Sequence, residues 1–198
     1  KLKLDDVVSK YLKKLKGSNK KNSNFHELLL HQSGWKPYIS HQFSLIKKNK
    51  KLKSRFVDNK NDDNKVELAK NLFVNKKYYN KIFRKIKRSK VKKQGDYAYS
   101  GLFFCLVPEI VKIMSKKSFE NFLIDEFYSK IGVNLLFNPL KKFPLDKIVP
   151  TEFDKIFRKQ LVQGYVHDET AALMGGISGN AGLFGSANDV GKISELLL

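Results

Sequence analysis

The feature that most constrains this chain is a long segment without cations, residues 160–191. Lys and Arg make up 39 of the 198 residues, yet none of them falls in this segment. Its run GGISGNAGLFGSAND repeats glycine at short intervals instead. Because glycine has no side chain, such a run lets the backbone approach a neighbour or a ligand closely. We therefore predict a Gly-rich, site-lining segment, bordered by the polar residues His167, Asp168 and Glu169.

Two other interpretations of the glycine run stay open. A phosphate-binding loop is one of them, since a glycine-rich loop that opens a helix can hold an anion. No strand pattern precedes the run, however, and no lysine lies within it to neutralise a phosphate. A purely structural turn is the other interpretation, and it needs no ligand.

The basic composition suggests an anionic partner without demanding one. A formal net charge of +20 favours nucleic acid, because clustered cations gain affinity by releasing counterions from phosphates. Only four basic residues are Arg, the residue that forks onto phosphates, and the lysines spread over most of the chain. Such a lysine excess is typical of solvated surfaces in a chain with AT-rich coding. A basic helical nucleic-acid-binding protein is therefore the less favoured interpretation.

Metal and cofactor chemistry have no support in the sequence. Cys105 is the single cysteine, which excludes an internal disulfide and a thiolate metal cluster. His26 and His31 in HELLLH are five residues apart, and five helical steps place their imidazoles about 140° apart. The two rings cannot share one metal ion from that helix. We predict no metal site and no cofactor.

The sequence shows no membrane span. GLFFCLVP, the longest uncharged apolar stretch, is far too short to cross a bilayer. No signal peptide is visible, so the compartment stays unknown. The chain does not begin with Met and stops at ELLL within a helical pattern. We expect an internal fragment of a longer polypeptide.

The spacing of apolar residues predicts a mainly α-helical chain. Residues 47–65 are rich in Lys, Asn and Asp and predict a mobile polar loop. Pro108 is expected to kink the helix that contains it. No strict apolar–polar alternation, the pattern of a half-buried strand, stands out. The expected helices cover residues 4–15, 24–31 with Asn24 as cap, 66–73, 76–88, 97–114, 118–132 with Ser118 as cap, and a last one capped by Ser186 or Asn188.

Five segments in order resemble a known family. They are KLKLDDVVSKYLKKL, HELLLHQSG, YAYSG opening an apolar helix, FYSKIGVNLLFNPL, and GGISGNAGLFGSANDV leading into a helix. This order is similar to the serine β-lactamase and penicillin-binding-protein-like hydrolases of the class C and D-alanyl-D-alanine peptidase type. The resemblance covers residues 1–198. The run PTEFD, GYVHDE and GGISGNAGLF is similar to a bacterial subgroup in which this domain follows a glycoside hydrolase family three domain.

The resemblance implies acyl-enzyme chemistry on peptidoglycan-type amides or esters. It also implies that the Ser-x-x-Lys helix precedes the chain and that the Lys/His-Thr-Gly strand follows it. Four Ser-x-x-Lys matches inside the chain (Ser18, Ser33, Ser44 and Ser89) are expected by chance at this lysine content. The chain is then expected to be a partial domain, the helical lobe of an α/β fold with most sheet strands missing. A bacterial envelope or periplasmic location follows from the resemblance.

The resemblance also assigns site residues. Tyr99, Ser100 and Gly101 match the tyrosine motif, with Tyr99 in the place of the phenol that relays protons between nucleophile, lysine and leaving group. Within the Gly-rich segment 160–191, residues 164–185 are implied to lie at the mouth of the cleft. The implied lining residues are His167, Asp168, Glu169, Gly175, Gly176, Gly179 and Asn180.

Three positions depart from the family pattern. Gly101 stands where Asn or Asp is usual, so the motif lacks the group expected to hold the lysine or the substrate. Asn180 stands where the subgroup tends to have His, and Pro108 where Gly is usual. These departures leave a catalytically degenerate homologue, acting as a binding or scaffold module, as the main alternative.

Overall fold

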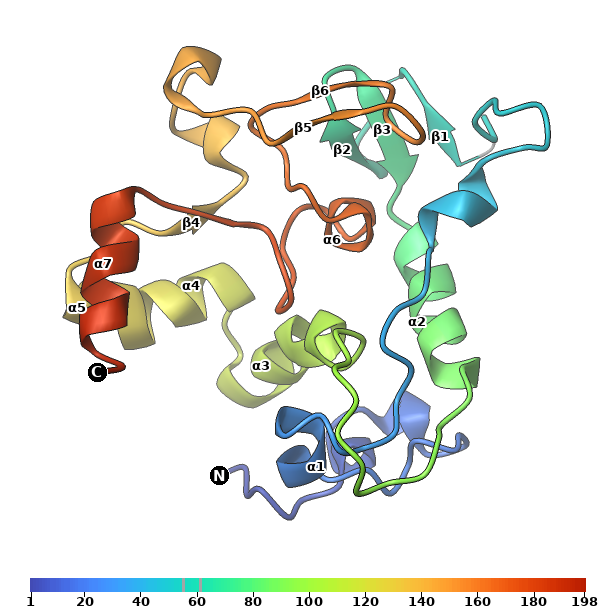
Figure 1. Ribbon diagram of the computed structural model, residues 1–198, viewed down its shortest axis with the longest axis vertical. Coiled ribbons are helices and arrows are strands. Elements are labelled where there is room, and N and C mark those ends of the chain that lie inside the picture. The colour runs from blue at the N-terminus through green and yellow to red at the C-terminus, as the bar shows by residue number, and fades with distance from the viewer. Residues whose placement is uncertain (55, 61) are drawn as a thin grey trace.

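The fold is mixed α/β and not mainly α. The computed structural model describes residues 1–54, 56–60 and 62–198. It is 37% helical and 14% strand, with several small sheets, so the expectation of a mainly α fragment is wrong. Figure 1 shows the helices α2, α3, α4, α5 and α7 around the lower part and sides of the molecule and most strands at its top. Helix α6 lies in the middle.

The N-terminal segment forms short turns of helix. The predicted single helix over 4–15 is wrong, because Val7 is extended and Leu12 leaves the helical region. The cap of the next helix is confirmed, since the Asn24 side chain accepts a hydrogen bond from the Glu27 N–H over 2.8 Å. The elements are η1 (Val8–Lys10), η2 (Lys13–Leu15), α1 (Phe25–Leu29) and η3 (Gln42–Leu45).

A three-stranded antiparallel sheet replaces the helix expected at 66–73. Its strands are β1 (Val57–Asp58), β2 (Lys65–Ala69) and β3 (Leu72–Asn75), in the order β1-β3-β2. Asn71 in the connection between β2 and β3 has a φ of 57°. Asparagine tolerates this left-handed conformation, and a two-residue turn of this kind closes an antiparallel hairpin. The apolar residues of this stretch therefore face one another across a hairpin.

The segment 47–65 is not structureless throughout. Strand β1 lies within it, pairs with β3, and buries Val57. Arg55 and Asn61 lie outside the described residues. The mobility expected for this segment stays a prediction.

Helix α2 (Tyr78–Arg88) confirms the helix expected at 76–88. The apolar run after Tyr99 forms η4 (Phe104–Leu106) and then α3 (Val107–Ser115). Pro108 lies in the first turn of α3, where its missing N–H needs no intrahelical partner. The expected kink at Pro108 is therefore wrong, because the proline helps to start the helix.

The helix expected at 118–132 is confirmed. It is continuous through α4 (Phe119–Leu123), the π-helical turn η5 (Ile124–Tyr128) and α5 (Ser129–Ile131). The Ser118 side chain caps it by accepting from the Asn121 N–H, and Gly132 ends it at a φ of 74°.

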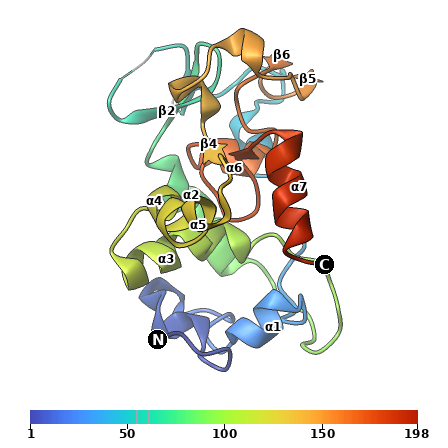
Figure 2. The same ribbon diagram turned by 90° about the vertical axis from the view of Figure 1, so that its left-hand side faces the viewer.

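The C-terminal part contains short paired strands and two helices. Its elements are β4 (Leu136–Phe137), η6 (Pro139–Lys141), η7 (Leu145–Lys147), β5 (Glu152–Asp154), β6 (Gln160–Val162), α6 (Glu169–Leu173), β7 (Leu183–Phe184) and α7 (Ala187–Glu195). Strand β4 pairs with β7, and β5 pairs with β6, both antiparallel. Ser186 and Asp189 form a reciprocal capping box at the start of α7. Figure 2 shows α7 along one side of the molecule.

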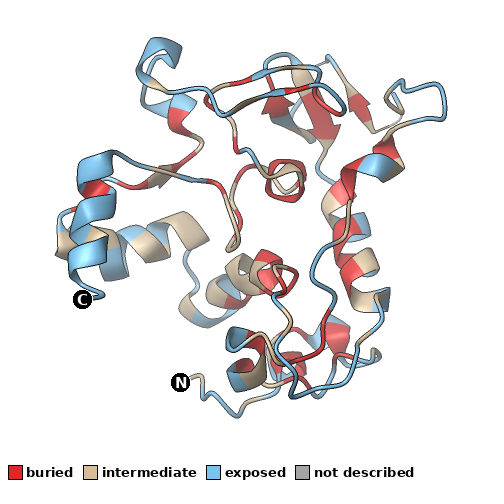
Figure 3. Cartoon of the chain, in the orientation of Figure 1, coloured by how far each residue is buried: buried red, intermediate tan, exposed pale blue. Residues whose placement is uncertain are grey.

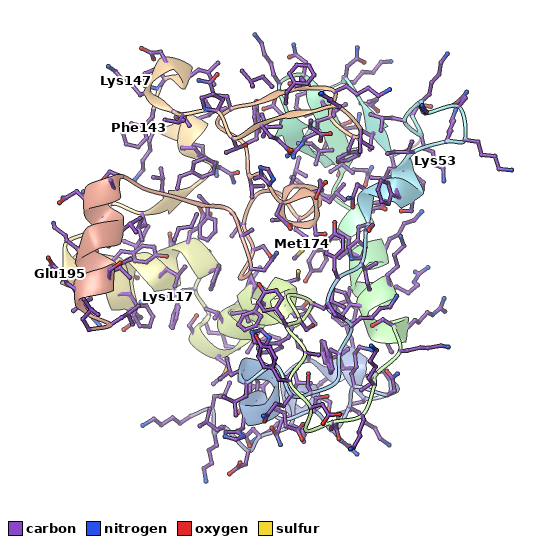
Figure 4. All side chains as sticks on the ribbon, in the orientation of Figure 1. Lys53, Lys117, Phe143, Lys147, Met174 and Glu195 are labelled. Atoms are coloured by element: carbon purple, nitrogen blue, oxygen red, sulfur yellow. The ribbon has the colours of Figure 1, made fainter. Side chains whose placement is uncertain are left out.

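One apolar core joins elements that are far apart in the sequence. It contains Leu12, Trp35, Ile82, Leu106 and Leu173, all nearly inaccessible to solvent. Figure 3 shows the buried residues concentrated in α6, η4 and the inner faces of α2 and the β1–β3 sheet. The labelled Met174, at the end of α6, lies in the middle of the molecule, whereas Lys147 lies at its edge (Figure 4). No helix within the described ranges has the length and apolar character needed to cross a membrane.

Candidate active site

Hydrogen bonds attach the tyrosine motif, Tyr99 to Gly101, to the loop that follows α1. The backbone N–H of Ser100 donates to Nδ1 of His31 over 3.2 Å, and Ser100 Oγ donates to the carbonyl of Lys36 over 2.7 Å. The N–H of Gly101 donates to the carbonyl of Pro37 over 3.2 Å. Ser100 is buried, while Tyr99 is 64% exposed. The motif thus holds its backbone rigidly and presents the Tyr99 phenol to solvent.

His31 carries an aromatic surface around Tyr99. Its ring centroid lies 4.7 Å from that of Tyr99, 5.9 Å from Tyr97 and 5.6 Å from Phe104. We call these four residues the tyrosine face. Because Nδ1 accepts from Ser100, the neutral ring carries its proton on Nε2. Sequence reasoning considered His31 only as a metal ligand, and within the described residues no His, Cys, Asp or Glu group could hold a metal.

The tip of the glycine-rich segment packs against the helix that follows the tyrosine motif. A Cβ on Gly179 would approach the carbonyl of Phe104 more closely than the 3.0 Å that real Cβ atoms keep. Oδ1 of Asn180 accepts from Ser178 Oγ over 2.6 Å and from Cys105 Sγ over 3.3 Å. We call residues 178–180 the loop tip. The structure therefore brings Gly179 and Asn180 into contact with η4, the helical turn that begins three residues after the tyrosine motif.

Cys105 is a plain buried thiol. Burial is the main cause that raises its pKa to about 12, and the negative charge of Asp168 adds to the effect. The thiol therefore stays protonated at neutral pH and is a poor nucleophile. Its function in this geometry is to donate the weak hydrogen bond to Asn180.

Gly175 and Gly176 pack elsewhere. Their φ angles of 95° and 82° favour glycine, and a Cβ on Gly176 would clash with the side chain of Asn138. Asn138 Nδ2 donates to the carbonyl of Gly175 over 3.0 Å, while Val66 of β2 lies against Gly175. These two glycines therefore let the turn after α6 pack closely against β2 and the start of η6. Their contacts are with Val66 and Asn138, whereas Tyr99 contacts His31.

The three polar residues before α6 have separate local partners. Asp168 caps α6 by accepting from the Ala171 N–H over 2.7 Å. Glu169 Oε1 accepts from Gln42 Nε2 over 3.2 Å. His167 is largely exposed, and its Nδ1 lies 3.8 Å from a carboxylate oxygen of Glu152. Within the described residues, Glu169 is the one of the three whose side chain forms a hydrogen bond with a distant part of the chain.

Arg158 fixes the segment that leads to these residues. Its side chain is fully buried and its Nε donates to Asp154 over 2.9 Å. Nη1 donates to the Val166 carbonyl over 2.7 Å, and Nη2 donates to the His167 carbonyl over 2.7 Å and to Glu152 over 2.9 Å. Burial raises the pKa of Asp154, but backbone N–H groups and the guanidinium outweigh it and hold the pKa below its usual range. Nothing in the sequence distinguishes this arginine from a surface cation.

A second polar centre lies around Glu169. It lines a hollow of about 260 Å³ together with Gln42, Phe43 and the β5–β6 connection. Gln42 Nε2 also donates to the hydroxyl of Tyr38 over 3.2 Å. Burial chiefly, and then the charges of Glu169 and Asp168, raise the pKa of Tyr38. No local pattern in the sequence indicates this centre, because Gln42 and Glu169 lie 127 residues apart.

None of the four Ser-x-x-Lys matches forms a catalytic pair in the described part of the chain, since no hydrogen bond there joins the hydroxyl of any of these serines to the ammonium of its lysine. Ser33 is buried, and Ser44 Oγ pairs with the hydroxyl of Tyr78 at 2.5 Å. Ser18 and Ser89 Oγ donate to the backbone carbonyls of Leu15 and Ile86. The geometry agrees with the expectation that these matches are coincidental.

Comparison with known proteins places these features in a family context. The Beta-lactamase family model matches residues 1–198. A "Putative D-alanyl-D-alanine carboxypeptidase" of Escherichia coli (strain K12) is 30% identical over 128 residues, 57% of this chain and 30% of that protein. The N-acetylmuramyl-L-alanine amidase of Bacillus subtilis (strain 168) is 32% identical over 116 residues, 52% of this chain and 26% of that protein. The chain thus matches under a third of the length of these relatives.

Two solved structures share the fold. The octameric penicillin-binding protein homologue from Pyrococcus abyssi aligns with a TM-score of 0.61 and 22% identity, over 98% of this chain and 39% of that one. A beta-lactamase-like structure from Bacteroides dorei DSM 17855 aligns with a TM-score of 0.55 and 20% identity, over 99% of this chain and 42% of that one. At these identities the likeness concerns the fold alone.

Proposed function

This chain belongs to the beta-lactamase family, and from that membership we propose that it is part of a serine hydrolase that cleaves amide or ester bonds through an acyl-enzyme. Two relatives carry names that refer to cell-wall peptides, a D-alanyl-D-alanine carboxypeptidase and an N-acetylmuramyl-L-alanine amidase. We therefore propose peptidoglycan-type peptides as the substrate class. A bacterial envelope location and a preceding glycoside hydrolase family three domain remain predictions.

The observation that carries the proposal is the presentation of Tyr99. Three hydrogen bonds fix the backbone of Ser100 and Gly101, and the neighbouring phenol stays exposed beside a histidine ring. A fixed backbone limits where the phenol oxygen can lie, and this positioning is what a proton relay needs. A tyrosine on a free loop would lose that advantage.

In the proposed reaction a serine from outside residues 1–198 attacks the carbonyl carbon and forms a tetrahedral oxyanion. Tyr99 passes the proton released by the serine to the leaving nitrogen or oxygen, and the bond to the leaving group breaks. Water then attacks the acyl-enzyme and gives a proton to Tyr99, while Tyr99 passes its own proton to the serine oxygen as the ester bond to serine breaks and the acid forms. Each proton lost by one group is gained by another, so the phenol is regenerated.

The loop tip is proposed to contact the substrate. Asn180 engages Oδ1 with Ser178 and Cys105, and within the described part of the chain its Nδ2 makes no hydrogen bond. Those bonds orient the amide, so Nδ2 can donate to a substrate carbonyl. Glu169 and His167 are proposed to lie farther along the cleft, where they would meet polar groups of a peptide.

Covalent labelling tests this function. The full-length product of the gene is incubated with a fluorescent penicillin, and the rate of label transfer is compared with those of Tyr99→Phe and Tyr97→Phe. Loss of the relay is expected to slow acylation by about 10²- to 10⁴-fold in Tyr99→Phe. Tyr97→Phe is the matched control, because Tyr97 is also largely exposed and contacts the same histidine ring. Equal rates in the two variants would remove Tyr99 from the mechanism.

One observation favours the second candidate, a degenerate homologue that acts as a binding or scaffold module. Gly101 supplies no side chain where the family has Asn or Asp. No labelling of the wild-type protein, together with retained binding of a peptidoglycan peptide, would favour this candidate over the hydrolase.

A further inference from the structure

We propose that the groove between α2 and residues 14–19 binds a small ligand that carries two phosphate groups. The groove has a volume of about 860 Å³ and is lined by the cations Lys14, Arg84, Lys87 and Arg88 and by the polar residues Ser18 and Asn19. Among the described residues that line it, none is acidic. It shares no residue with the tyrosine face or the loop tip, so the proposal is independent of the proposed hydrolase function.

The arginines carry the argument. Arg158 engages the carboxylates of Asp154 and Glu152. Arg84 and Arg88, the other arginines in the described ranges, form no ion pair there. They lie four residues apart on α2, so their side chains leave the same face one turn apart, about 6 Å between Cβ atoms. Two neighbouring guanidinium forks match the oxygens of a diphosphate, which offers several acceptors over a similar span.

The wall opposite α2 is held in place by a buried lysine. The Lys20 side chain is fully buried, and its ammonium donates to the Ser89 carbonyl and to Asn19 Oδ1. Asn19 Nδ2 donates to the same Ser89 carbonyl over 3.2 Å, and the ammonium lies 5.4 Å from the centroid of a Trp35 ring. These contacts join residues 19–20 to the end of α2, so the groove is formed before a ligand arrives.

Lys14 brings a positive charge to the groove from η2. Its Nζ lies 5.3 Å from the centroid of Phe83 on α2 and 3.2 Å from a carboxylate oxygen of Glu109. Glu109 lies outside the groove and partly balances this charge. Cations in the last turn of α2 also complement the helix dipole. The dipole explains why α2 tolerates them, but it does not explain why a fourth cation approaches from another element.

The diphosphate chemistry is tested with inorganic diphosphate on the full chain in 150 mM salt. Binding is followed by isothermal titration calorimetry and by amide NMR shifts of residues 14–20 and 78–89. The test variant is R84Q/R88Q. The matched control is K81Q/K85Q, which removes the same charge from the same helix at the same spacing but outside the groove.

Saturable binding is expected, weakened at least about tenfold in R84Q/R88Q and less than about twofold in K81Q/K85Q. R84K/R88K keeps the charge and loses the forks, so an intermediate affinity is expected. Equal weakening in the test and control variants would overturn the proposal, because net charge alone would then explain the attraction. Absence of saturable binding would also overturn it.

A single-stranded oligonucleotide distinguishes the source of the phosphates. Diphosphate binding that a tenfold molar excess of oligonucleotide fails to displace would support a small ligand. Oligonucleotide binding in the absence of diphosphate binding would overturn the proposal and favour a polymer. Neither result depends on acylation, so failure of the hydrolase proposal leaves this test intact.

Discussion

Nδ1 of His31 accepts a hydrogen bond from the backbone N–H of Ser100 over 3.2 Å, across 69 residues of sequence. The same ring lies against Tyr99 in a tilted arrangement, with a centroid distance of 4.7 Å. His31 thus accepts the hydrogen bond of the Ser100 N–H and also packs against the Tyr99 side chain. The loop after α1 therefore determines where the candidate proton relay lies.

Replacing His31 with Phe should destabilise the chain. The ring contacts are retained in large part, but the buried Ser100 N–H loses its acceptor, which costs about 1–3 kcal/mol. Urea unfolding measures the change. His26→Phe, at an exposed position of α1, is the control and should change stability by less than about 0.5 kcal/mol. A similar small change in His31→Phe would show that the hydrogen bond contributes little.

Glycine at position 179 should be required, while glycine at 191 should not. Alanine at 179 places a Cβ against the Phe104 carbonyl, and the loop tip must move, at a cost of about 1–3 kcal/mol. At Gly191 within α7, a Cβ meets no atom within 4 Å, so alanine should stabilise the helix by about 0.5–1 kcal/mol. Opposite signs in thermal unfolding are expected. A neutral Gly179→Ala would mean that the loop tip is not packed on η4.

Gly101→Asn should be tolerated. An added Cβ at this position meets nothing within 4 Å, and its backbone is not in the left-handed region. The substitution restores the amide usual at this motif position, so the penicillin labelling rate should rise, by about tenfold if one hydrogen bond is gained. Gly101→Ala is the control, since it fills the same space without an amide. No difference between the two variants would show that the amide is not what the motif lacks.

Acid should destabilise the chain through His41. This residue is fully buried, and neither ring nitrogen has a hydrogen-bond partner among the described residues. Burial, with help from the Lys85 charge, lowers its pKa to about 4. The unfolded state binds the proton first, because its pKa is about 6.5. The free energy of unfolding is therefore not reduced by His41 above pH 6.5, and it falls by about 3 kcal/mol as the pH drops towards 4.

Urea unfolding between pH 4 and pH 7 measures this dependence. His41→Leu should flatten the profile in that window, whereas His26→Leu should retain the wild-type slope. If His41→Leu keeps the slope, another group is responsible for the acid sensitivity.

Arg158→Ala should destabilise the chain by about 3–5 kcal/mol, because the buried Asp154 carboxylate loses its guanidinium partner and the carbonyls of Val166 and His167 lose their donors. Arg158→Lys should recover only part of the loss, since an ammonium lacks the planar fork. Arg84→Ala, on an exposed face of α2, is the control for general loss of charge. Equal losses of unfolding free energy at the two positions, measured by urea unfolding, would contradict the stabilising function of the buried Arg158 hydrogen bonds.

Local signals in the sequence predicted the helix ends well. Asn24 and Ser118 cap helices as expected, and Ser186 is the cap of α7 of the two alternatives predicted, because a cap depends on residues only three positions away. The β2–β3 hairpin was missed, since its apolar residues fit a helical period as well as a strand period. Pairing with neighbouring strands and the turn at Asn71 favour the strand conformation over the helix, and strand pairing is a tertiary interaction that the local pattern does not contain.

The candidate site was only partly predictable for the same reason. The glycine spacing correctly indicated close backbone packing, as the fit of Gly179 against Phe104 shows. The contact of Gln42 with Glu169, and those of Arg158 with two carbonyls, have no local signature. An arginine in a chain with so many cations looks like any other until its burial is known.

The hydrogen bond between Cys105 and Asn180 spans 75 residues. Contacts of such separation form only after a long loop has closed, and loop closure is slow compared with the formation of a helical turn. During synthesis, the tyrosine motif leaves the ribosome well before the loop tip exists. The candidate site therefore reaches its final shape late in folding, and until then Tyr99 belongs to an unfinished surface.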